Sequence, residues 1–90
     1  MIFKITSFLR PKVAPAIGSL AALPRRSRAV IDSIGGDRPF RRRLMEMGLV
    51  PGTVISIVNV APLGDPIELE VRSSRISIRR HEAALIAVRQ

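Results

Sequence analysis

Ninety residues suffice for one small domain with a single hydrophobic core. The chain has no cysteine, which excludes disulfides, thiolate metal sites and a cysteine nucleophile. Its formal net charge is +8, and 13 of its 15 basic residues are arginine. We therefore expect an anionic neighbour, which can be nucleic acid, an acidic protein surface or the negative inner leaflet of a membrane.

The first 16 residues have the character of an appendage rather than of a folded element. They contain Pro11 and Pro15, carry basic residues and follow neither a helical nor a strand period, as mobile termini often do. The start is too short and too charged for a signal peptide, and no apolar run approaches the ~20 residues of a spanning helix. The sequence predicts a flexible basic extension over residues 1–16, a domain over residues 17–90, and a soluble cytoplasmic protein.

Beyond a short turn that Ser19 can cap, the chain has the pattern of strands separated by turn-forming residues. Residues 67–72 alternate apolar and charged side chains, which is typical of a half-exposed strand. The expected strands cover residues 28–34, 53–60, 67–72, 75–79 and 85–88. Since closing such a sheet removes exposed edges, the sequence predicts a mainly β fold, a small SH3-like barrel of about five strands.

One short α-helix is expected between the first and second of these strands. Asp37 is the predicted N-cap, because its carboxylate can accept a hydrogen bond from the first turn. Phe40, Leu44 and Met47 follow at spacings of four and three residues, which places them on one buried face. Gly48 is expected to end the helix in the left-handed conformation, which residues with a Cβ avoid.

The order of these elements, and the motifs between them, resemble the ferrous iron transport protein A (FeoA) family. The most specific part is Arg-Leu-Met-Glu-Met-Gly-Leu at residues 43–49, followed by Pro-Gly at residues 51–52. Ala-Pro-Leu-Gly-Asp-Pro at residues 61–66 and Ile-Arg-Arg-His-Glu-Ala at residues 78–83 lie at matching distances downstream. The resemblance extends over residues 17–88.

This resemblance implies both a fold and a role. Members of the family are small cytoplasmic SH3-like proteins that work with FeoB, a membrane ferrous-iron transporter with a cytoplasmic GTP-binding domain. The resemblance implies an accessory or regulatory protein of ferrous iron uptake, located in the cytoplasm or peripherally at the inner face of the membrane. The same fold forms the terminal domain of iron- and manganese-dependent repressors, so the alternative is a basic module that binds nucleic acid or serves such a repressor.

Two features depart from the family pattern. Members often have a glycine after the first proline, where this chain has Pro24-Arg25, so this turn is expected to differ in shape. The N-terminal extension is also unusual for so compact a family. The contact with the partner can therefore differ from the contact that is common in the family.

Catalysis is not expected from these residues. The chain has one histidine, no tyrosine and no Ser/His/Asp set at a telling spacing, so it is not predicted to be an enzyme. His81 and Glu82 are weak candidates for metal ligands, because adjacent residues do not share a helical face. No cofactor is required, and the family resemblance makes a weak or bridging transition metal, Fe2+ or Zn2+, conceivable at His81 and an acidic side chain.

The expected contact surface centres on the basic helix. Arg38 precedes the run Arg41, Arg42 and Arg43, and arginine-rich surfaces attract acidic ones. A helix spreads three consecutive residues over about 200 degrees, so these side chains cannot all face one partner, and a solvated helix face is the alternative. As a binding surface they would meet an acidic region on the cytoplasmic part of the transporter.

The loop at residues 61–66 is the second candidate for partner contact. Leu63 stands at its tip beside Asp65, and such a segment is either a simple turn or a recognition element on a rigid scaffold. Base stacking and binding of Pro-rich peptides are disfavoured, because the chain has no Trp or Tyr. Nucleic acid is thus a less favoured partner than protein, and self-association stays open. A second basic face is expected around the third and fourth strands: Arg72, Arg75, Arg79 and Arg80.

Overall fold

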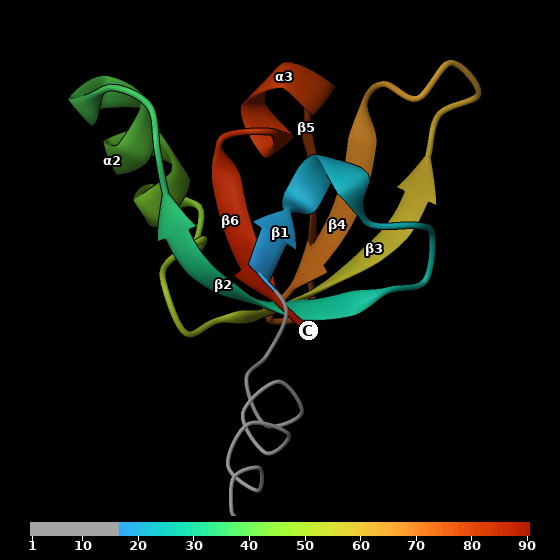
Figure 1. The fold of residues 1–90 in the computed structure, drawn as a ribbon, viewed down its shortest axis with the longest axis horizontal. Helices are drawn as coiled ribbons and strands as arrows, with labels where there is room; N and C mark the ends of the chain where they lie inside the picture. The colour runs from blue at the N-terminus through green and yellow to red at the C-terminus, as the bar shows by residue number, and fades with distance from the viewer. Residues whose placement is uncertain (1–16) are drawn as a thin grey trace, which may run out of the picture.

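A computed structural model describes residues 17–90 of the chain, and the predicted extension over residues 1–16 lies outside the described residues. Six antiparallel strands form one sheet in the order β1-β6-β2-β3-β4-β5. The strands are β1 (Ile17–Ser19), β2 (Arg28–Ile34), β3 (Val54–Val60), β4 (Ile67–Val71), β5 (Ser74–Ile78) and β6 (Ile86–Arg89). They converge at one end of the sheet and spread toward the other, where the helices lie (Figure 1).

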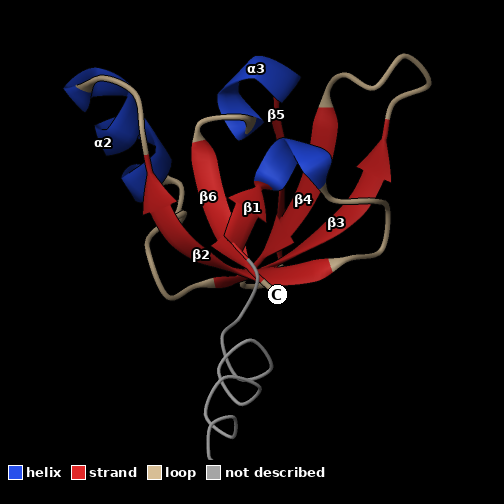
Figure 2. Cartoon of the chain, in the orientation of Figure 1, coloured by secondary structure: helices blue, strands red, loops and turns tan. Residues whose placement is uncertain are grey.

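The helical segments are the 3-10 turn η1 (Leu20–Ala22), α2 (Arg38–Glu46) and α3 (Arg80–Ala83). Figure 2 shows them, with the loop at residues 61–66, along the rim of a curved sheet. Register irregularities between Ile31 and Ser33 in β2 and between Ile57 and Asn59 in β3 bend these strands, as β-bulges do. No helix within the described part of the chain has the length and apolar character needed to cross a bilayer.

The expectation of five strands, with the helix between the first and second, is wrong. The structure has six strands and places α2 between β2 and β3, because β1 precedes the first strand expected from the sequence. β1 has three residues and pairs with β6, with Ile17 opposite Arg89. A strand this short leaves no alternating pattern to detect. The mainly β class is confirmed, although within residues 17–90 no pairing between β1 and β5 closes the sheet.

The core lies on the inner face of the curved sheet and consists of aliphatic side chains. Alternate strand residues, such as Ile55 and Ile57, point into it and are buried. Leu20 from η1, Leu44 from α2 and Leu49 after α2 are buried with them. Burial of one such side chain stabilises by about 1.5–3 kcal/mol, so these three leucines fasten the peripheral segments to the sheet.

The limits of α2 follow the sequence prediction. Asp37 Oδ1 accepts a hydrogen bond from the Phe40 amide at 3.0 Å, as an N-cap does. At the other end Gly48 has a φ of +93°, and the Leu49 amide donates to the Leu44 carbonyl at 2.9 Å. This is a Schellman motif, which satisfies the last carbonyls of the helix and buries Leu49. The predicted N-cap and glycine stop are therefore confirmed.

The turn at residues 24–27 places a side chain where glycine would be expected. The Ser27 amide donates to the Pro24 carbonyl at 3.3 Å, and Arg26 between them has a φ of +68°. A left-handed backbone costs a residue with a Cβ roughly 1–2 kcal/mol. The positive φ of Arg26 thus leaves local strain in this turn, one position beyond the predicted departure from the glycine pattern at Pro24-Arg25.

Arg26→Gly is expected to raise the free energy of unfolding by about 1 kcal/mol, because glycine adopts a positive φ without steric cost. Urea denaturation followed by circular dichroism measures this change. Arg25→Gly is the matched control, since Arg25 lies in the same turn without a positive φ, and it is expected to be neutral or slightly destabilising. Equal effects of the two substitutions would contradict strain confined to Arg26.

Candidate partner-binding surface

The two segments predicted to contact a partner, α2 and the loop at residues 61–66, lie at the same end of the sheet on either side of α3 (Figure 1). Each is joined to α3 by polar contacts. The short helix therefore links them into one surface, although β3 lies between them in the sequence.

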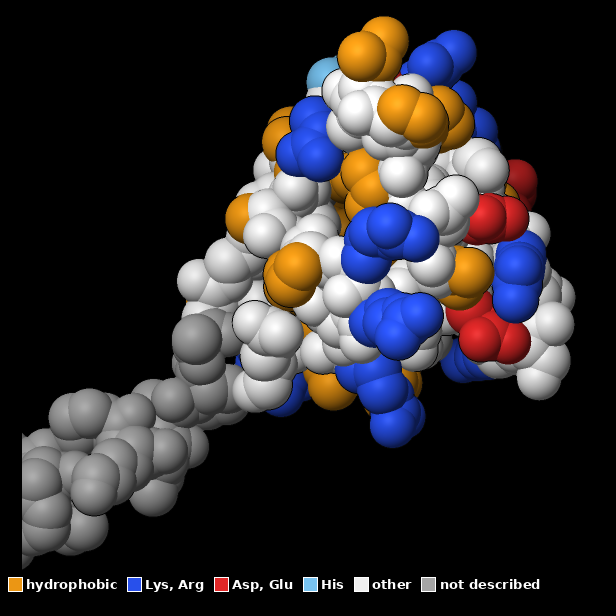
Figure 3. Space-filling model, turned by 90° about the vertical axis from the view of Figure 1, so that its right-hand side faces the viewer, with side chains coloured by type: hydrophobic (Ala, Val, Ile, Leu, Met, Phe, Trp, Pro, Cys, Tyr) orange, Lys and Arg blue, Asp and Glu red, His pale blue; other side chains and the backbone are white. Residues whose placement is uncertain are grey.

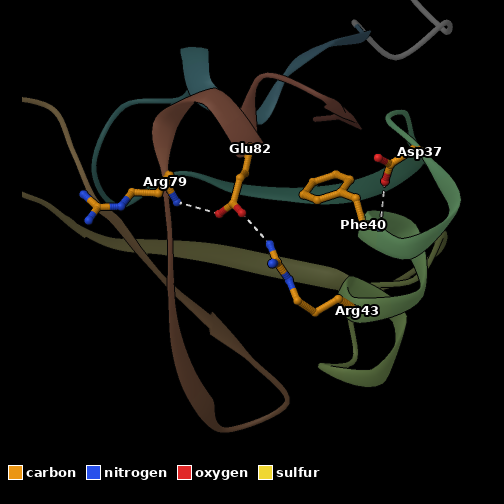
Figure 4. A network of polar contacts seen from close by, with 5 residues as sticks. All are labelled: Asp37, Phe40, Arg43, Arg79 and Glu82. Atoms are coloured by element: carbon orange, nitrogen blue, oxygen red, sulfur yellow. Dashed lines mark hydrogen bonds and ion pairs between the residues drawn. The ribbon is translucent and has the colours of Figure 1, made fainter.

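Arg43 of α2 and Glu82 of α3 form an ion pair (Figure 4). Arg43 Nη2 donates to Glu82 Oε2, and the other carboxylate oxygen, Oε1, accepts from the Arg79 amide at 3.0 Å. The Arg43 guanidinium also lies 5.7 Å from the centre of the Phe40 ring, within the range of a cation–π interaction. Arg43 therefore acts inside the molecule, where it holds α2 against α3.

These contacts lower the pKa of Glu82 below its ordinary value of 4.5. The largest cause is the hydrogen bond from the Arg79 amide, and the Arg43 guanidinium adds to it, while partial burial opposes both. The Glu82 side chain is 19% exposed and that of Arg43 is 55% exposed, so water screens the pair only in part. Glu82 is thus a fixed negative charge at neutral pH.

The other predicted arginines divide between internal contacts and solvent. Arg41 Nη1 donates to the Gly36 carbonyl just before the helix. Arg38 and Arg42 are exposed and have no ion-pair partner among the residues that the structure describes. Together with Pro39 they line a shallow hollow on α2. Two of the four predicted arginines are therefore available to a partner.

Leu63 stands at the tip of the loop at residues 61–66 and is 96% exposed. The loop is closed by hydrogen bonds from the Gly64 amide to the Ala61 carbonyl at 2.7 Å and from the Ala61 amide to the Pro66 carbonyl at 3.1 Å. Figure 3 shows hydrophobic side chains exposed at the end of the face that carries this loop, above a column of basic ones. Leu63 is thus an apolar side chain that a partner can reach.

Arg80 holds this loop in place from α3. Its Nε donates to the Gly64 carbonyl at 2.8 Å, and its Nη1 donates to the Ala21 carbonyl of η1 at 2.8 Å. The Arg80 amide donates to Asp65 Oδ1 at 2.9 Å, and Arg79 Nη1 lies 4.0 Å from Asp65 Oδ2. The Asp65 carboxylate, predicted to meet a partner, is therefore engaged inside the molecule, where it anchors the loop.

The role of Arg80 has no signal in the sequence. The alternating pattern before it predicts a solvated basic face, whereas its guanidinium bonds to two backbone carbonyls, those of Gly64 and Ala21. Any residue type provides a backbone carbonyl, so no residue at those positions marks Arg80 as a structural contact.

The predicted metal ligands do not fit a metal site within one molecule. His81 is exposed on α3, while both oxygens of Glu82 are engaged by Arg43 and the Arg79 amide. Across residues 17–90 no group of three or more His, Cys, Asp or Glu side chains is placed to hold a metal ion. A metal at Glu82 would have to displace Arg43, and with it the contact between the two helices.

Glu82→Gln is expected to lower the free energy of unfolding by about 1 kcal/mol at neutral pH, because it removes the ion pair but keeps an oxygen for the Arg79 amide. The folded pKa of Glu82 lies below the ordinary value of 4.5, so its charge stabilises the fold above that value. This contribution is lost as the pH falls through the folded pKa. Urea denaturation across this pH range should show that the difference in free energy of unfolding between the variant and the wild type becomes smaller as the pH falls.

Glu68→Gln provides the baseline for this comparison, since it removes a carboxylate that lies opposite Ser77 and Asn59 and has no ion-pair partner in the described range. A Glu82→Gln difference that keeps its full size in acid would mean that packing, and not charge, causes the destabilisation.

The sequence matches a family model described as the FeoA domain over residues 18–90. It is also 41% identical over 69 residues to the Fe(2+) transport protein A/Fe(2+) transporter FeoB fusion protein of Porphyromonas gingivalis. That match covers 77% of this chain and 8% of the fusion protein. The chain therefore spans a small part of this relative.

Solved structures share the fold. The FeoA protein of Chlorobium tepidum is 39% identical with a TM-score of 0.75, over 79% of this chain and 68% of that one. The FeoA of Stenotrophomonas maltophilia, an SH3 domain protein complexed with zinc, is 31% identical with a TM-score of 0.68, over 78% and 87%. A manganese-dependent transcriptional repressor, 15% identical with a TM-score of 0.77 over 86% and 43%, is alike in fold alone. The SH3-like fold is thereby confirmed, and the chain belongs to the FeoA domain family.

Proposed function

We propose that this chain is an accessory protein of ferrous iron uptake that contacts the cytoplasmic region of a FeoB-type transporter, at the inner face of the membrane, and catalyses no reaction. The observation that carries the proposal is the P. gingivalis relative, whose name joins Fe(2+) transport protein A to the transporter FeoB. Fusion raises the effective concentration of two parts for one another, which matters when they act together. A separate chain of the same family needs a surface that provides this contact.

The contact surface that we propose combines Leu63 with Arg38 and Arg42. Leu63 is an apolar anchor of the kind that a partner's pocket can bury, and the two arginines supply positive charge on the other side of α3. An acidic surface around an apolar pocket on the transporter would complement both. Hydrogen bonds from Arg80 already hold the loop at residues 61–66 in place. Binding would therefore cost little conformational entropy in this loop.

Other roles have less support from the molecule. A metal that bridges two molecules through His81 would need ligands from the second molecule, since Glu82 is held by Arg43. Binding of nucleic acid would rest on net charge alone, because the likeness to the repressor at 15% identity concerns the fold. Protein contact uses both the exposed leucine and the available arginines, and is therefore favoured.

Leu63→Asp is expected to abolish capture of the purified cytoplasmic region of the same organism's FeoB-type transporter, because it places a charge in the apolar contact. Arg42→Ala is expected to weaken capture about fivefold and to reduce its salt dependence, since it removes one attractive charge. Biolayer interferometry at two salt concentrations, with duplex DNA as the competing bait, measures both effects.

Arg25→Ala is the matched control, because it removes the same charge from an exposed turn away from α2, and capture should be unchanged. Full capture by both the Leu63→Asp and Arg42→Ala variants would rule out this surface. Capture of duplex DNA alone, lost at the higher salt concentration, would replace the proposal with a nucleic-acid-binding role.

Arg80→Met is expected to weaken capture roughly threefold to tenfold with Leu63 still present, because the loop would then lose conformational entropy on binding. Hydrogen exchange at the Gly64 amide should accelerate in the same variant. Arg79→Met is the control, since its guanidinium approaches Asp65 only to 4.0 Å, and it should change neither quantity much. Faster hydrogen exchange at the Gly64 amide without weaker capture would show that the hydrogen bonds of Arg80 stabilise the loop but do not contribute to binding.

A further inference from the structure

A groove on the outer face of the sheet lies at the opposite end from Leu63. It has a volume of about 660 Å³ and is lined by the start of β3 and the end of β4, whereas the loop at residues 61–66 joins the other ends of these strands. Its lining includes two arginines, two serines, a valine and a glutamate: Arg28, Arg72, Ser56, Ser73, Val54 and Glu70. The contact surface proposed above uses none of them.

The groove carries positive charge that the fold does not neutralise. Neither Arg28 nor Arg72 has an ion-pair partner among residues 17–90. Glu70 lies directly opposite Arg75 in the pairing of β4 with β5, and opposite charges at such positions attract. The two arginines of the lining are therefore left to attract an anionic group from outside the molecule.

The turn that carries one of these arginines is conformationally costly. Arg72 and Ser73 connect β4 to β5 with φ angles of +50° and +71°. A two-residue hairpin turn with two positive φ angles favours Asn-Gly, because most side chains resist this conformation. Both residues line the groove, so the turn places a guanidinium and a hydroxyl at its edge, and strained residues of this kind often mark binding sites.

An adjoining hollow makes the binding region longer than a small inorganic anion requires. This hollow, of about 260 Å³, shares Arg28 and Val54 with the groove and continues to Val30 and Arg89. Val54, common to both, is 45% exposed. A lining that combines basic and apolar side chains suits an extended chain with acidic and apolar side chains at every second position, because residues two apart share one face of such a chain.

We propose that this groove binds an extended acidic segment of a protein partner, with a carboxylate on Arg28 and Arg72 and an apolar side chain on Val54. The planar guanidinium of arginine can donate two parallel hydrogen bonds to one carboxylate. Nucleic acid fits less well, because its repeating phosphates would leave the exposed Val54 unused. Assigning the segment to the FeoB-type transporter rests on the proposed function, whereas the preference for an acidic and apolar chain rests on the groove.

Two fluorescein-labelled probes test the groove with the full chain. One is a set of short overlapping peptides that tile the cytoplasmic region of the same organism's transporter. The other is a synthetic peptide that repeats Glu-Ser-Leu-Ser, so that glutamate and leucine lie on one face of the extended chain. Fluorescence anisotropy measures binding, and heteronuclear NMR spectra locate it. We expect the synthetic peptide and an acidic tile to shift the amides of residues 52–56 and 70–73 more than those of residues 38–46.

Arg28→Ala is expected to weaken peptide binding about tenfold, through loss of one charge-assisted contact. The double substitution Arg72→Asn, Ser73→Gly should weaken binding to a similar extent while raising the urea concentration at the unfolding midpoint, because Asn-Gly suits the turn. A purely structural role for these residues would not combine a more stable fold with weaker binding. Arg25→Ala is the matched control, because it removes the same charge from an exposed turn that lines neither the groove nor the adjoining hollow, and it should leave peptide affinity unchanged.

Three results would overturn the inference: no peptide bound at the groove, equal weakening by Arg28→Ala and Arg25→Ala, or stronger competition by duplex DNA or inorganic phosphate than by unlabelled peptide. If the synthetic peptide binds there and no tile does, the groove stands and its partner is not this transporter. If the transporter is captured through Leu63 while neither probe shifts groove amides, the groove inference fails and the proposed function stands.

Discussion

The polar contacts of α3 hold together parts of the chain that the sheet alone would leave apart. Glu82 binds α2 through Arg43, and Arg80 binds both the loop at residues 61–66 and η1. A helix of one turn is not stable by itself in water, so α3 depends on the burial of Ala83 in the core. The positions of the candidate contact residues at this end of the molecule therefore depend on one short segment whose own stability comes from tertiary packing.

Sequence reasoning succeeded where the physical cause is local. Asp37, Gly48 and the apolar face of α2 depend on neighbours within about one turn of helix, and all three behave as predicted. The prediction failed for β1, whose strand character comes from pairing with β6 at the far end of the domain. The candidate site divides in the same way, since the Arg43 guanidinium is engaged by Glu82, 39 positions away. No local pattern contains such a contact.

The net charge of +8 predicts an anionic partner without saying which kind, and the distribution of the charge is more informative. Several arginines are engaged inside the molecule, whereas exposed ones remain at two separate ends of the sheet: Arg38 and Arg42 at one, Arg28 and Arg72 at the other. At one end they lie on the same surface as Leu63, and at the other they flank Val54. Phosphate backbones need only charge, whereas basic groups combined with an exposed apolar side chain are typical of surfaces that bind protein.

Residues with a left-handed backbone occur at two kinds of position in this small domain, some beside a possible binding site and some not. Arg26, Arg72 and Ser73 all have positive φ angles, and at roughly 1 kcal/mol or more each they take a sizeable share of the 5–15 kcal/mol that stabilises a typical domain. Arg26 lines none of the hollows described, so relaxing its backbone should stabilise the fold without loss. Arg72 and Ser73 line a groove, where relaxation would also remove the groups that bind. Strain therefore points to function only where the strained side chain also faces a space that a ligand can occupy.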